Sequence, residues 1–269
     1  MDTKKIWGVT MVRNEEDIIY HSLLHLAEEG VDGIIVADNM STDNTREEIL
    51  RAQSVLIDSP CQITLADDHE EGYYQSRKMT ALAKRAHEEF GADWIIPFDA
   101  DEIMFSPLRL KEFFNQLPEN INVVEAELWD HYGTGLDEVG MPFEVMQWKH
   151  EKLPLPKVAF KWQEDAIIGM GNHSVMMKDI KSTGGLEIRH FPYRSWEHFK
   201  RKAINGSLAT VDLPKQFCAH WRSYSELINK WGDDVVRREV FEKYFWHLSP
   251  VDNGMKLDPA PFRRWNSAT

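Results

Sequence analysis

Three carboxylates follow a short apolar run near the middle of the chain. Residues 94–98 are apolar and too few for a stable helix, and Asp99, Asp101 and Glu102 come directly after them. This pattern predicts a buried strand with acidic side chains at its C-terminal end. Carboxylates this close repel one another unless a positive charge lies among them, and their hard oxygens suit Mg²⁺ or Mn²⁺ holding a phosphate. A solvated acidic turn is the alternative.

These acids need a sheet to position them, and the first half of the chain has the pattern of one. Apolar runs predict strands at residues 6–12, 33–37 and 63–65, followed by helical patterns at about residues 14–30, 45–50 and 73–90. This order predicts a parallel sheet with right-handed crossovers. Asp38, Asp67 and Asp99 are therefore expected to meet along the edge where such sheets bind ligands.

Small polar residues predict where helices begin. Asn14 is expected to cap the first helix, and Ser195 a later one that starts at residue 196. Ser41 or Asp43 is expected either to cap the second helix or to bind a ligand, since both roles suit these residues equally well.

The second half of the chain is less regular. A helix is expected at residues 110–117, a strand at 123–128, a loop with acceptor-binding groups at 129–135, an acceptor loop or plain surface loop at 147–156, and paired strands at 157–177. A strand ending within residues 188–195 precedes the helix at 196–208. Aromatic residues between 223 and 247 predict one or two helices that cover the sheet or form a subunit contact, so a homo-oligomer is one expectation.

Composition narrows the class of protein. The chain has 269 residues, of which 42% are hydrophobic, enough for one large domain or a domain with an extension. Its net charge of −13 argues against a nonspecific nucleic-acid surface, and a small-molecule partner is expected. Two cysteines, Cys61 and Cys218, provide no disulfide framework. Because no run is long enough to span a membrane and no signal peptide is visible, a cytoplasmic protein is expected.

Three motifs at predicted strand ends together resemble family 2 glycosyltransferases. They are Arg13-Asn14-Glu15, residues 36–45 with Asp38-Asn39, and residues 93–102 with Asp99-Ala100-Asp101-Glu102. The resemblance covers roughly the first half of the chain. It implies an α/β fold of the GT-A type, a Rossmann-like, mostly parallel sheet flanked by helices, with a C-terminal helical extension. The expected divisions are a GT-A domain at 1–195, with nucleotide-sugar binding at 1–105 and the acceptor side at 106–195, and the extension at 196–269.

The resemblance also implies roles for individual residues. Asp38 would contact the nucleotide base, Asp99 the ribose or the metal, and Asp101 the metal that bridges the diphosphate. The set expected to bind the nucleotide sugar is Arg13, Asn14, Glu15, Asp38, Asn39, Asp67, Arg77, Asp99, Tyr193 and Arg194.

A late histidine is expected to complete the metal site. His190 lies at a strand end in a segment that resembles bacterial members of the same family, so the expected ligands are Asp99, Asp101 and His190. Tyr193 and Arg194 would bind the diphosphate, the arginine through its paired donors. Arg77 could reach a phosphate or the base, but a basic residue on an exposed helix face is the commoner case.

The catalytic base should follow the central acids, on the acceptor side. Asp130, Glu164, Asp165 and His173 qualify by position, and Asp165 ranks first, then His173. Glu164-Asp165 resembles the paired acids of family 2 enzymes, although its surroundings look like strands and not the expected helix start. Exposed strand charges are the alternative account of this pair.

The resulting hypothesis is a metal-dependent glycosyltransferase. It would move a sugar from a nucleotide diphosphate sugar, with UDP the expected nucleotide, to a hydroxyl of a saccharide or other acceptor, with inversion. A nucleotidyltransferase or phosphotransferase could use the same acids, but residues 11–15 lack the Gly-rich basic loop expected after the first strand of the former. A noncatalytic nucleotide-sugar-binding protein is the alternative from another class.

Overall fold

A computed structural model describes residues 3–134, 142, 146–212, 214, 218–247 and 254–257. The strands are β1 (Ile6–Val12), β2 (Gly33–Asp38), β3 (Gln62–Asp67), β4 (Trp94–Pro97), β5 (Glu102–Phe105), β6 (Val123–Thr134), β7 (Trp148–Lys152), β8 (Lys157–Lys161), β9 (Ile167–Ile168), β10 (Val175–Met176), β11 (Ser182–His190), β12 (Trp246–His247) and β13 (Lys256–Leu257). The helices are α1 (Ile19–Glu28), α2 (Thr45–Val55), α3 (Gln75–Phe90), α4 (Leu110–Gln116), η1 (Met170–Asn172), α6 (Trp196–Ala209), α7 (Ala219–Trp231), α8 (Asp233–Val236), η2 (Arg237–Phe241) and α9 (Glu242–Tyr244).

The first half of the chain forms a parallel sheet in the order β3-β2-β1-β4. Asp38 pairs in register with Val12 on one side and with Asp67 on the other, so the C-terminal ends of three strands lie level. Every residue of β2 is buried, as expected for a central strand covered on both faces. The α/β fold predicted from the sequence is therefore confirmed.

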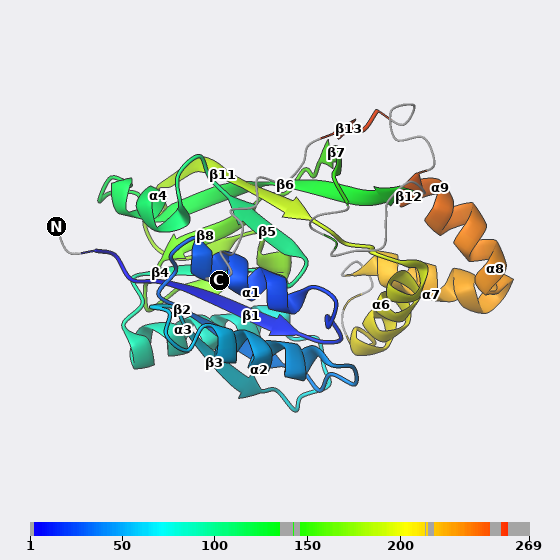
Figure 1. Ribbon diagram of the computed structural model, residues 1–269, viewed down its shortest axis with the longest axis horizontal. Helices are drawn as coiled ribbons and strands as arrows, with labels where there is room; N and C mark the ends of the chain where they lie inside the picture. Colours follow the sequence, from blue (N-terminus) through cyan, green and yellow to red (C-terminus); the bar gives the residue numbers. More distant parts are fainter. Residues whose placement is uncertain are drawn as a thin grey trace.

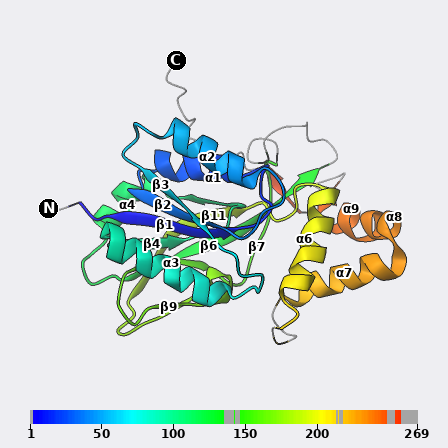
Figure 2. The same ribbon diagram turned by 90° about the horizontal axis from the view of Figure 1, so that it is seen from below.

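Helices cover both faces of this sheet, with α1 and α2 on one face and α3 on the other (Figure 2). Side chains of β2 alternate between two cores, because successive residues of a strand point to opposite faces. Ile34 and Val36 belong to the core beneath α1 and α2, and Ile35 and Ala37 to the core beneath α3. Helix α3 ends at Gly91, whose φ of 70° is a conformation that glycine adopts without a Cβ penalty.

The second half adds a mixed set of strands, and two sequence-based expectations are wrong here. Strand β6 pairs antiparallel with β7 and β8 and parallel with β11. The loop expected at 129–135 is the continuation of β6 as far as Thr134, and Gly135 lies outside the described residues. The loop expected at 147–156 contains strand β7, so only the turn after Lys152 is irregular.

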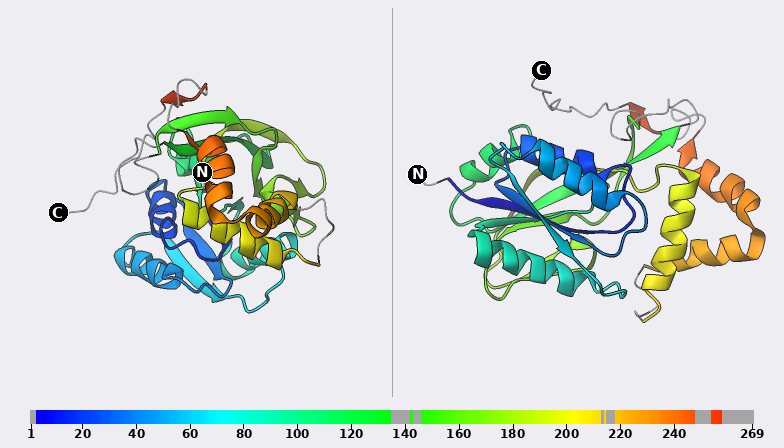
Figure 3. Two further views of the ribbon diagram at one scale, coloured as in Figure 1. Left: turned by 90° about the vertical axis from the view of Figure 1, so that its right-hand side faces the viewer. Right: turned by 60° about the horizontal axis from the view of Figure 1, so that its bottom comes forward.

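The C-terminal helices form a layer at one end of the sheet (Figures 1 and 3). They lie at the end toward which β1 points, so they cover the carboxyl ends of the parallel strands and not a face of the sheet. Their own core contains Trp196, Phe199, Ala203, Ile228, Val236 and Phe241. The N-terminus of α6 has the predicted cap, since Ser195 Oγ accepts a hydrogen bond from His198 N at 3.1 Å.

Asn14, by contrast, caps no helix. Helix α1 begins at Ile19, and Asn14 has a left-handed φ of 60° in the preceding loop. Within the described residues, no helix is both long enough and apolar enough to cross a membrane.

Candidate active site

A cleft of about 580 Å³ lies between the carboxyl ends of the parallel strands and the C-terminal helices. Its walls come from the β1–α1 loop, the segment after β4, the end of β11, and helices α6 and α7. The cleft contains these residues of the sets expected from the sequence: Arg13, Asn14, Glu15, Asn39, Asp99, Asp101, His173, His190 and Tyr193. The fold thus brings together three of the predicted strand-end motifs.

Three basic side chains surround the carboxylate of Asp101, which lines this cleft. Its carboxylate is almost completely buried, and its Oδ2 lies 2.6 Å from Lys202 Nζ, 3.7 Å from His190 Nε2 and 3.7 Å from Arg194 Nη1. Burial alone raises the pKa of Asp101, but these three cationic groups outweigh it and hold the pKa far below its ordinary value. Asp101 is therefore ionised, and its basic neighbours come from the end of β11, from the segment after it and from α6.

His190 is oriented by a buried carboxylate. Its Nδ1 lies 2.7 Å from Asp130 Oδ1, and Asp130 Oδ2 accepts a hydrogen bond from Tyr132 Oη at 2.8 Å. Burial lowers the pKa of His190, yet Asp101 and Asp130 raise it above its ordinary value overall. A histidine whose Nδ1–H is held by a carboxylate presents Nε2 to the cleft, which is a common arrangement for a metal ligand.

Asp99 and Glu102 form a second group with Lys157. Lys157 Nζ lies 2.8 Å from Asp99 Oδ2 and 2.6 Å from Glu102 Oε1. The other oxygen of Asp99 accepts hydrogen bonds from Asn172 at 3.2 Å and Gln75 at 3.4 Å. Burial raises the pKa of Glu102 to about 7, against the opposing charge of Lys157. The ammonium of Lys157 therefore neutralises Asp99, whereas the sequence predicted that a metal ion would do so.

The donor set fits a divalent cation at Asp101 and His190. Both groups face the cleft, and the third expected ligand, Asp99, is held instead by Lys157, Asn172 and Gln75. In the part of the chain that the structure describes, no three His, Cys, Asp or Glu residues form a metal-binding group. The remaining ligands of a hard cation would therefore have to be oxygens of a phosphate or of water.

Hydrogen bonds and ion pairs join the loop after β1 to the segment that precedes α6. Arg194 donates hydrogen bonds to Glu15, Asp17 and the carbonyl of Phe191, and also contacts His198. Burial lowers the pKa of Arg194, but Glu15 and Asp17 raise it far above its ordinary value. The expectation that Arg194 binds diphosphate is not met in this arrangement, because protein groups engage its guanidinium and it does not line the cleft.

The loop after β2 is braced by its own acids. Asp38 Oδ1 accepts a hydrogen bond from Ser41 N, and Asp43 Oδ1 accepts one from Thr45 N at the start of α2. Asn14 ties this loop to the β1–α1 loop, because its Oδ1 accepts a hydrogen bond from Thr42 N at 2.7 Å. Asp38 does not line the cleft, so here it holds the loop in shape.

Asn39 lines the cleft and fixes the segment after β3. Its Nδ2 donates hydrogen bonds to the side chain of Asp68 and to the carbonyl of Glu70. Asp67 is half exposed and pairs with Arg46 at 2.7 Å, outside the cleft. Asp38 and Asp67 thus lie at the predicted edge of the sheet, but their carboxylates face away from the cleft.

His173 is the candidate base that the structure places in the cleft. Its Nδ1 lies 2.8 Å from the carbonyl oxygen of Pro156, so this nitrogen carries the proton and Nε2 is the acceptor. Burial, followed by the charge of Lys157, lowers the pKa of His173. A neutral imidazole with a free acceptor nitrogen can take a proton from a hydroxyl group.

The other candidates for the catalytic base do not line the cleft, and neither does Arg77 of α3, which was expected to bind the donor. Glu164 and Asp165 are exposed between β8 and β9, and Glu164 pairs with Lys84 on the outer face of α3. Arg77 is exposed and pairs with Glu70. Asp130 is buried behind His190 and does not line the cleft. For these four residues the structure differs from the sequence-based expectation, because none of them lines the cleft.

Several cleft residues were missed by the sequence analysis. Lys157 contacts Asp99 across 58 positions of sequence, and Lys202 contacts Asp101 across 101 positions. Gln75 joins α3 to η1, since its Oε1 accepts a hydrogen bond from Gly171 N and its Nε2 donates one to Asp99. The local sequence around these three residues gives no signal of their role. Each becomes recognisable only when the fold brings it beside an acid from a distant part of the chain.

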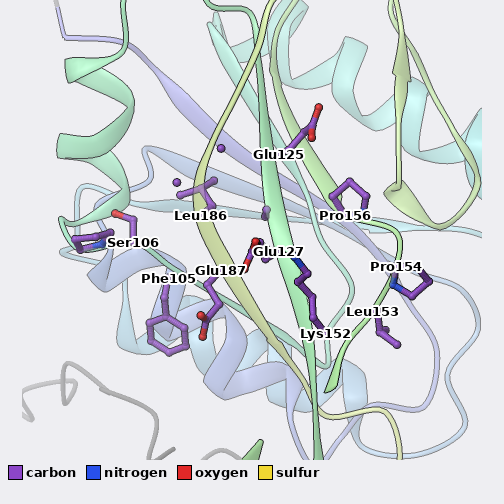
Figure 4. A pocket seen from close by; sticks show the side chains of 14 residues that line it. Phe105, Ser106, Glu125, Glu127, Lys152, Leu153, Pro154, Pro156, Leu186 and Glu187 are labelled. Atoms are coloured by element: carbon purple, nitrogen blue, oxygen red, sulfur yellow. Dashed lines mark hydrogen bonds and ion pairs between the residues drawn. The ribbon is translucent and has the colours of Figure 1, made fainter. Parts of the chain in front are cut away.

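A second hollow of about 600 Å³ lies on another part of the sheet (Figure 4). It is lined by the strands β6 and β11 and by the turn after β7, with Leu153 shared between the two hollows. Its charged groups are Glu125, Glu127, Lys152 and Glu187, of which Glu127 and Lys152 form an exposed ion pair at 3.1 Å. We refer to it as the groove.

The sequence of the chain matches the model of one known family. Residues 9–181, well over half of the chain, match the family described as glycosyl transferase family 2. No curated protein matches the chain by sequence.

Three solved structures are similar to this chain, each at low identity. A mannosyltransferase from Pyrobaculum calidifontis in complex with GDP-Man and Mn²⁺ is 17% identical, with a TM-score of 0.43, over 87% of this chain and 73% of that one. A glucosyl-3-phosphoglycerate synthase from Mycobacterium tuberculosis in complex with phosphoglyceric acid is 16% identical, with a TM-score of 0.33, over 59% and 57%. A mycobacterial protein is 12% identical, with a TM-score of 0.38, over 77% and 74%.

Proposed function

Because this chain belongs to glycosyl transferase family 2 and is a glycosyltransferase, we propose that it transfers a sugar from a nucleotide diphosphate donor to a hydroxyl acceptor in the cleft beside Asp101. The observation that carries the proposal is the convergence on Asp101 of His190, Lys202 and Arg194 at the carboxyl ends of the parallel strands. Such a place suits an anionic ligand bound through a cation.

The cofactor in this proposal is Mn²⁺ or Mg²⁺, held by Asp101 and His190. When bound, the ion would act as a Lewis acid that neutralises the charge growing on the departing diphosphate. Asp130 and Tyr132 would keep the imidazole of His190 in the required tautomer.

The donor nucleotide in the proposal is UDP, as expected from the sequence. Asn14 and Asn39 shape the wall where the nucleotide would lie, because their side chains hold the loops after β1 and β3 in place. Asp38 supports this wall from behind through Ser41. The base, ribose and sugar contacts belong to the cleft residues Arg13, Glu15, Asp99 and Tyr193 in this proposal.

The proposed base is His173. Its Nδ1–H is fixed on the carbonyl oxygen of Pro156, so Nε2 can accept the proton of the acceptor hydroxyl as that oxygen attacks the sugar. Attack from the side opposite the departing diphosphate gives inversion. Asp165, which ranked first by sequence, lies outside the cleft and would need a rearrangement to reach the acceptor.

Donor turnover tests this proposal. The full chain is incubated with UDP-sugars and GDP-sugars, with Mn²⁺ or with EDTA, and the nucleotide products are separated by chromatography. We expect release of the nucleoside diphosphate that depends on the metal, loss of release in Asp101→Asn, and normal release in the control Glu164→Gln, whose side chain pairs with Lys84 outside the cleft. Metal-independent release, or release unaffected by Asp101→Asn, would contradict the proposal.

The products also distinguish glycosyl transfer from the nucleotidyl or phosphoryl transfer that the same acids could serve. A nucleotidyltransferase or phosphotransferase would transfer a nucleotidyl or phosphoryl group, so the products would be a nucleotidyl conjugate with free pyrophosphate or sugar phosphate, or a phosphorylated acceptor. The same chromatogram distinguishes these products from a free nucleoside diphosphate. A chain that only binds nucleotide sugars would show affinity for UDP and no product of either kind.

A further inference from the structure

Lys202 reaches the centre of the cleft from the C-terminal extension. It lies on α6, and its Nζ is 2.6 Å from Asp101 Oδ2 in a side chain that is 22% exposed. Its ammonium also approaches the carbonyl oxygen of Pro192 at 3.5 Å. Lys202 lines the cleft, so its ammonium can reach a ligand there as well as Asp101.

The guanidinium of Arg194, a second cation near Asp101, is held more firmly. Arg194 Nη1 lies 3.7 Å from Asp101, but its guanidinium is fixed by Glu15 and Asp17. Arg194 therefore contributes a constant positive charge. Lys202 has a flexible four-carbon stem and one strong contact, so it is the cation whose position can change.

An ammonium and a divalent cation compete for the same carboxylate. Asp101 carries one negative charge in a buried place, and two cations on it repel each other strongly because little water screens them. A diphosphate changes this balance, since its several negative charges can bind the metal ion and the ammonium at the same time. Metal affinity should thus depend on whether a diphosphate is present.

We propose that Lys202 makes metal binding depend on the donor. Its ammonium pairs with Asp101 in the free protein, and it pairs with the diphosphate once the donor binds, which leaves Asp101 to the metal ion. This inference rests on the proposed function and extends it to the order in which the ligands bind. Lys202 is then a diphosphate-binding residue, and the metal ion and the nucleotide each raise the affinity of the other by the same factor.

Mn²⁺ titrations of the full chain test this inference without any activity assay. Bound Mn²⁺ is measured by electron paramagnetic resonance with MnCl₂ alone and with saturating UDP or GDP. For the wild type we expect nucleotide to tighten Mn²⁺ binding by about 10-fold or more, within the usual range of coupling between sites.

Three substitutions on α6 separate the roles of the lysines at positions 200 and 202. Lys202→Met should bind Mn²⁺ alone about 5-fold or more tighter than the wild type, and the effect of nucleotide should shrink, because the competing charge is gone. Lys200→Met is the matched control, since Lys200 lies on the same helix as Lys202, pairs with Asp233 of α8 and does not line the cleft. It should behave as the wild type does. Lys202→Arg keeps the charge and should keep the dependence on nucleotide.

The outcomes distinguish this inference from the proposed function. Unchanged or weaker binding of Mn²⁺ alone by a folded Lys202→Met, with nucleotide-dependent binding intact in the wild type, would overturn the role of Lys202 and leave the proposed function standing. If Lys202→Met melts well below the wild type, the comparison is made with Lys202→Gln. Absence of Mn²⁺ binding by the wild type with either nucleotide would overturn both.

Discussion

The cleft and the groove have nearly the same volume, about 580 and 600 Å³, but their charged groups differ in kind. In the cleft, Asp101, Glu102 and Lys157 are at most 5% exposed. In the groove, Lys152 and Glu127 are about half exposed and neutralise each other in water. Volume therefore does not separate the two hollows, whereas the burial of opposite charges does.

The difference follows from where the charges originate. The cleft gathers side chains from the segment after β4 and from β8, β11 and α6, and each buried charge must find a partner from another element because isolated buried charges are costly. The groove uses residues on the outward face of β6 and on the adjacent β7, whose charges meet across neighbouring strands. Its ion pairs are those of an ordinary sheet surface.

The largest expected effect tests whether the buried charges of the cleft depend on one another. Lys157→Met leaves Asp99 and Glu102 without their ammonium, and breaking a buried pair in this way costs about 3–5 kcal/mol. Urea denaturation at pH 8 measures the free energy of unfolding. A loss below about 1 kcal/mol would show that the two carboxylates find other partners, and the contrast with the groove would then be weaker than we infer.

Removing the central carboxylate should affect chemistry more than stability. Asp101→Asn takes away a negative ligand and should lower metal-dependent donor turnover by about 100-fold or more. Glu187→Gln in the groove is the control and should leave turnover unchanged. Equal losses in the two variants would mean that the groove takes part in the reaction.

His173→Gln should lower kcat by about 100-fold with nucleotide affinity retained, since a general base contributes that much in the transition state. The pH profile gives an independent check. Because the pKa of His173 is lowered, its imidazole is neutral at and above pH 6.5, and the wild-type kcat at saturating metal and donor should fall only on the acid side of pH 6.5. A profile that falls already above that pH, or an unaltered kcat in the variant, would point to another base.

The smallest effect is expected in the groove. Lys152→Met breaks the exposed pair with Glu127 and should change the free energy of unfolding by less than about 1 kcal/mol, as surface pairs do. Donor hydrolysis should be the same as in the wild type. A selective loss of transfer to the acceptor, with donor hydrolysis intact, would show that the acceptor extends past Leu153 into the groove.

The sequence was sufficient for the parallel sheet and for the position of its acids. Residues 94–98 are apolar and are followed at once by Asp99 and Asp101, and both features depend only on neighbours in the chain. The same holds for Ser195, whose role as a cap requires only the helix that follows it. The family motifs added the function class, which the strand pattern alone does not contain.

The rest of the site depends on contacts that local patterns do not carry. Asp130 and His131 look like loop residues, yet both are buried in β6 because His190 and the carbonyl oxygen of Met146 satisfy their polar atoms. Glu164 and Asp165 look like a catalytic pair, but nothing in their sequence shows that they lie outside the cleft. Buried polar residues are predicted correctly only once their distant partners are known.

The contact between Arg194 and the β1–α1 loop has a consequence for synthesis on the ribosome. Arg194 donates hydrogen bonds to Glu15 and Asp17 across 179 and 177 positions of the chain. The partner of the β1–α1 loop is therefore synthesised long after the loop itself. Strands β1 to β4 leave the ribosome long before Arg194, because the chain is synthesised from its N-terminus. The residues of the parallel sheet are therefore made early and those of the charge network late, so the site can be completed only after Arg194 has been synthesised.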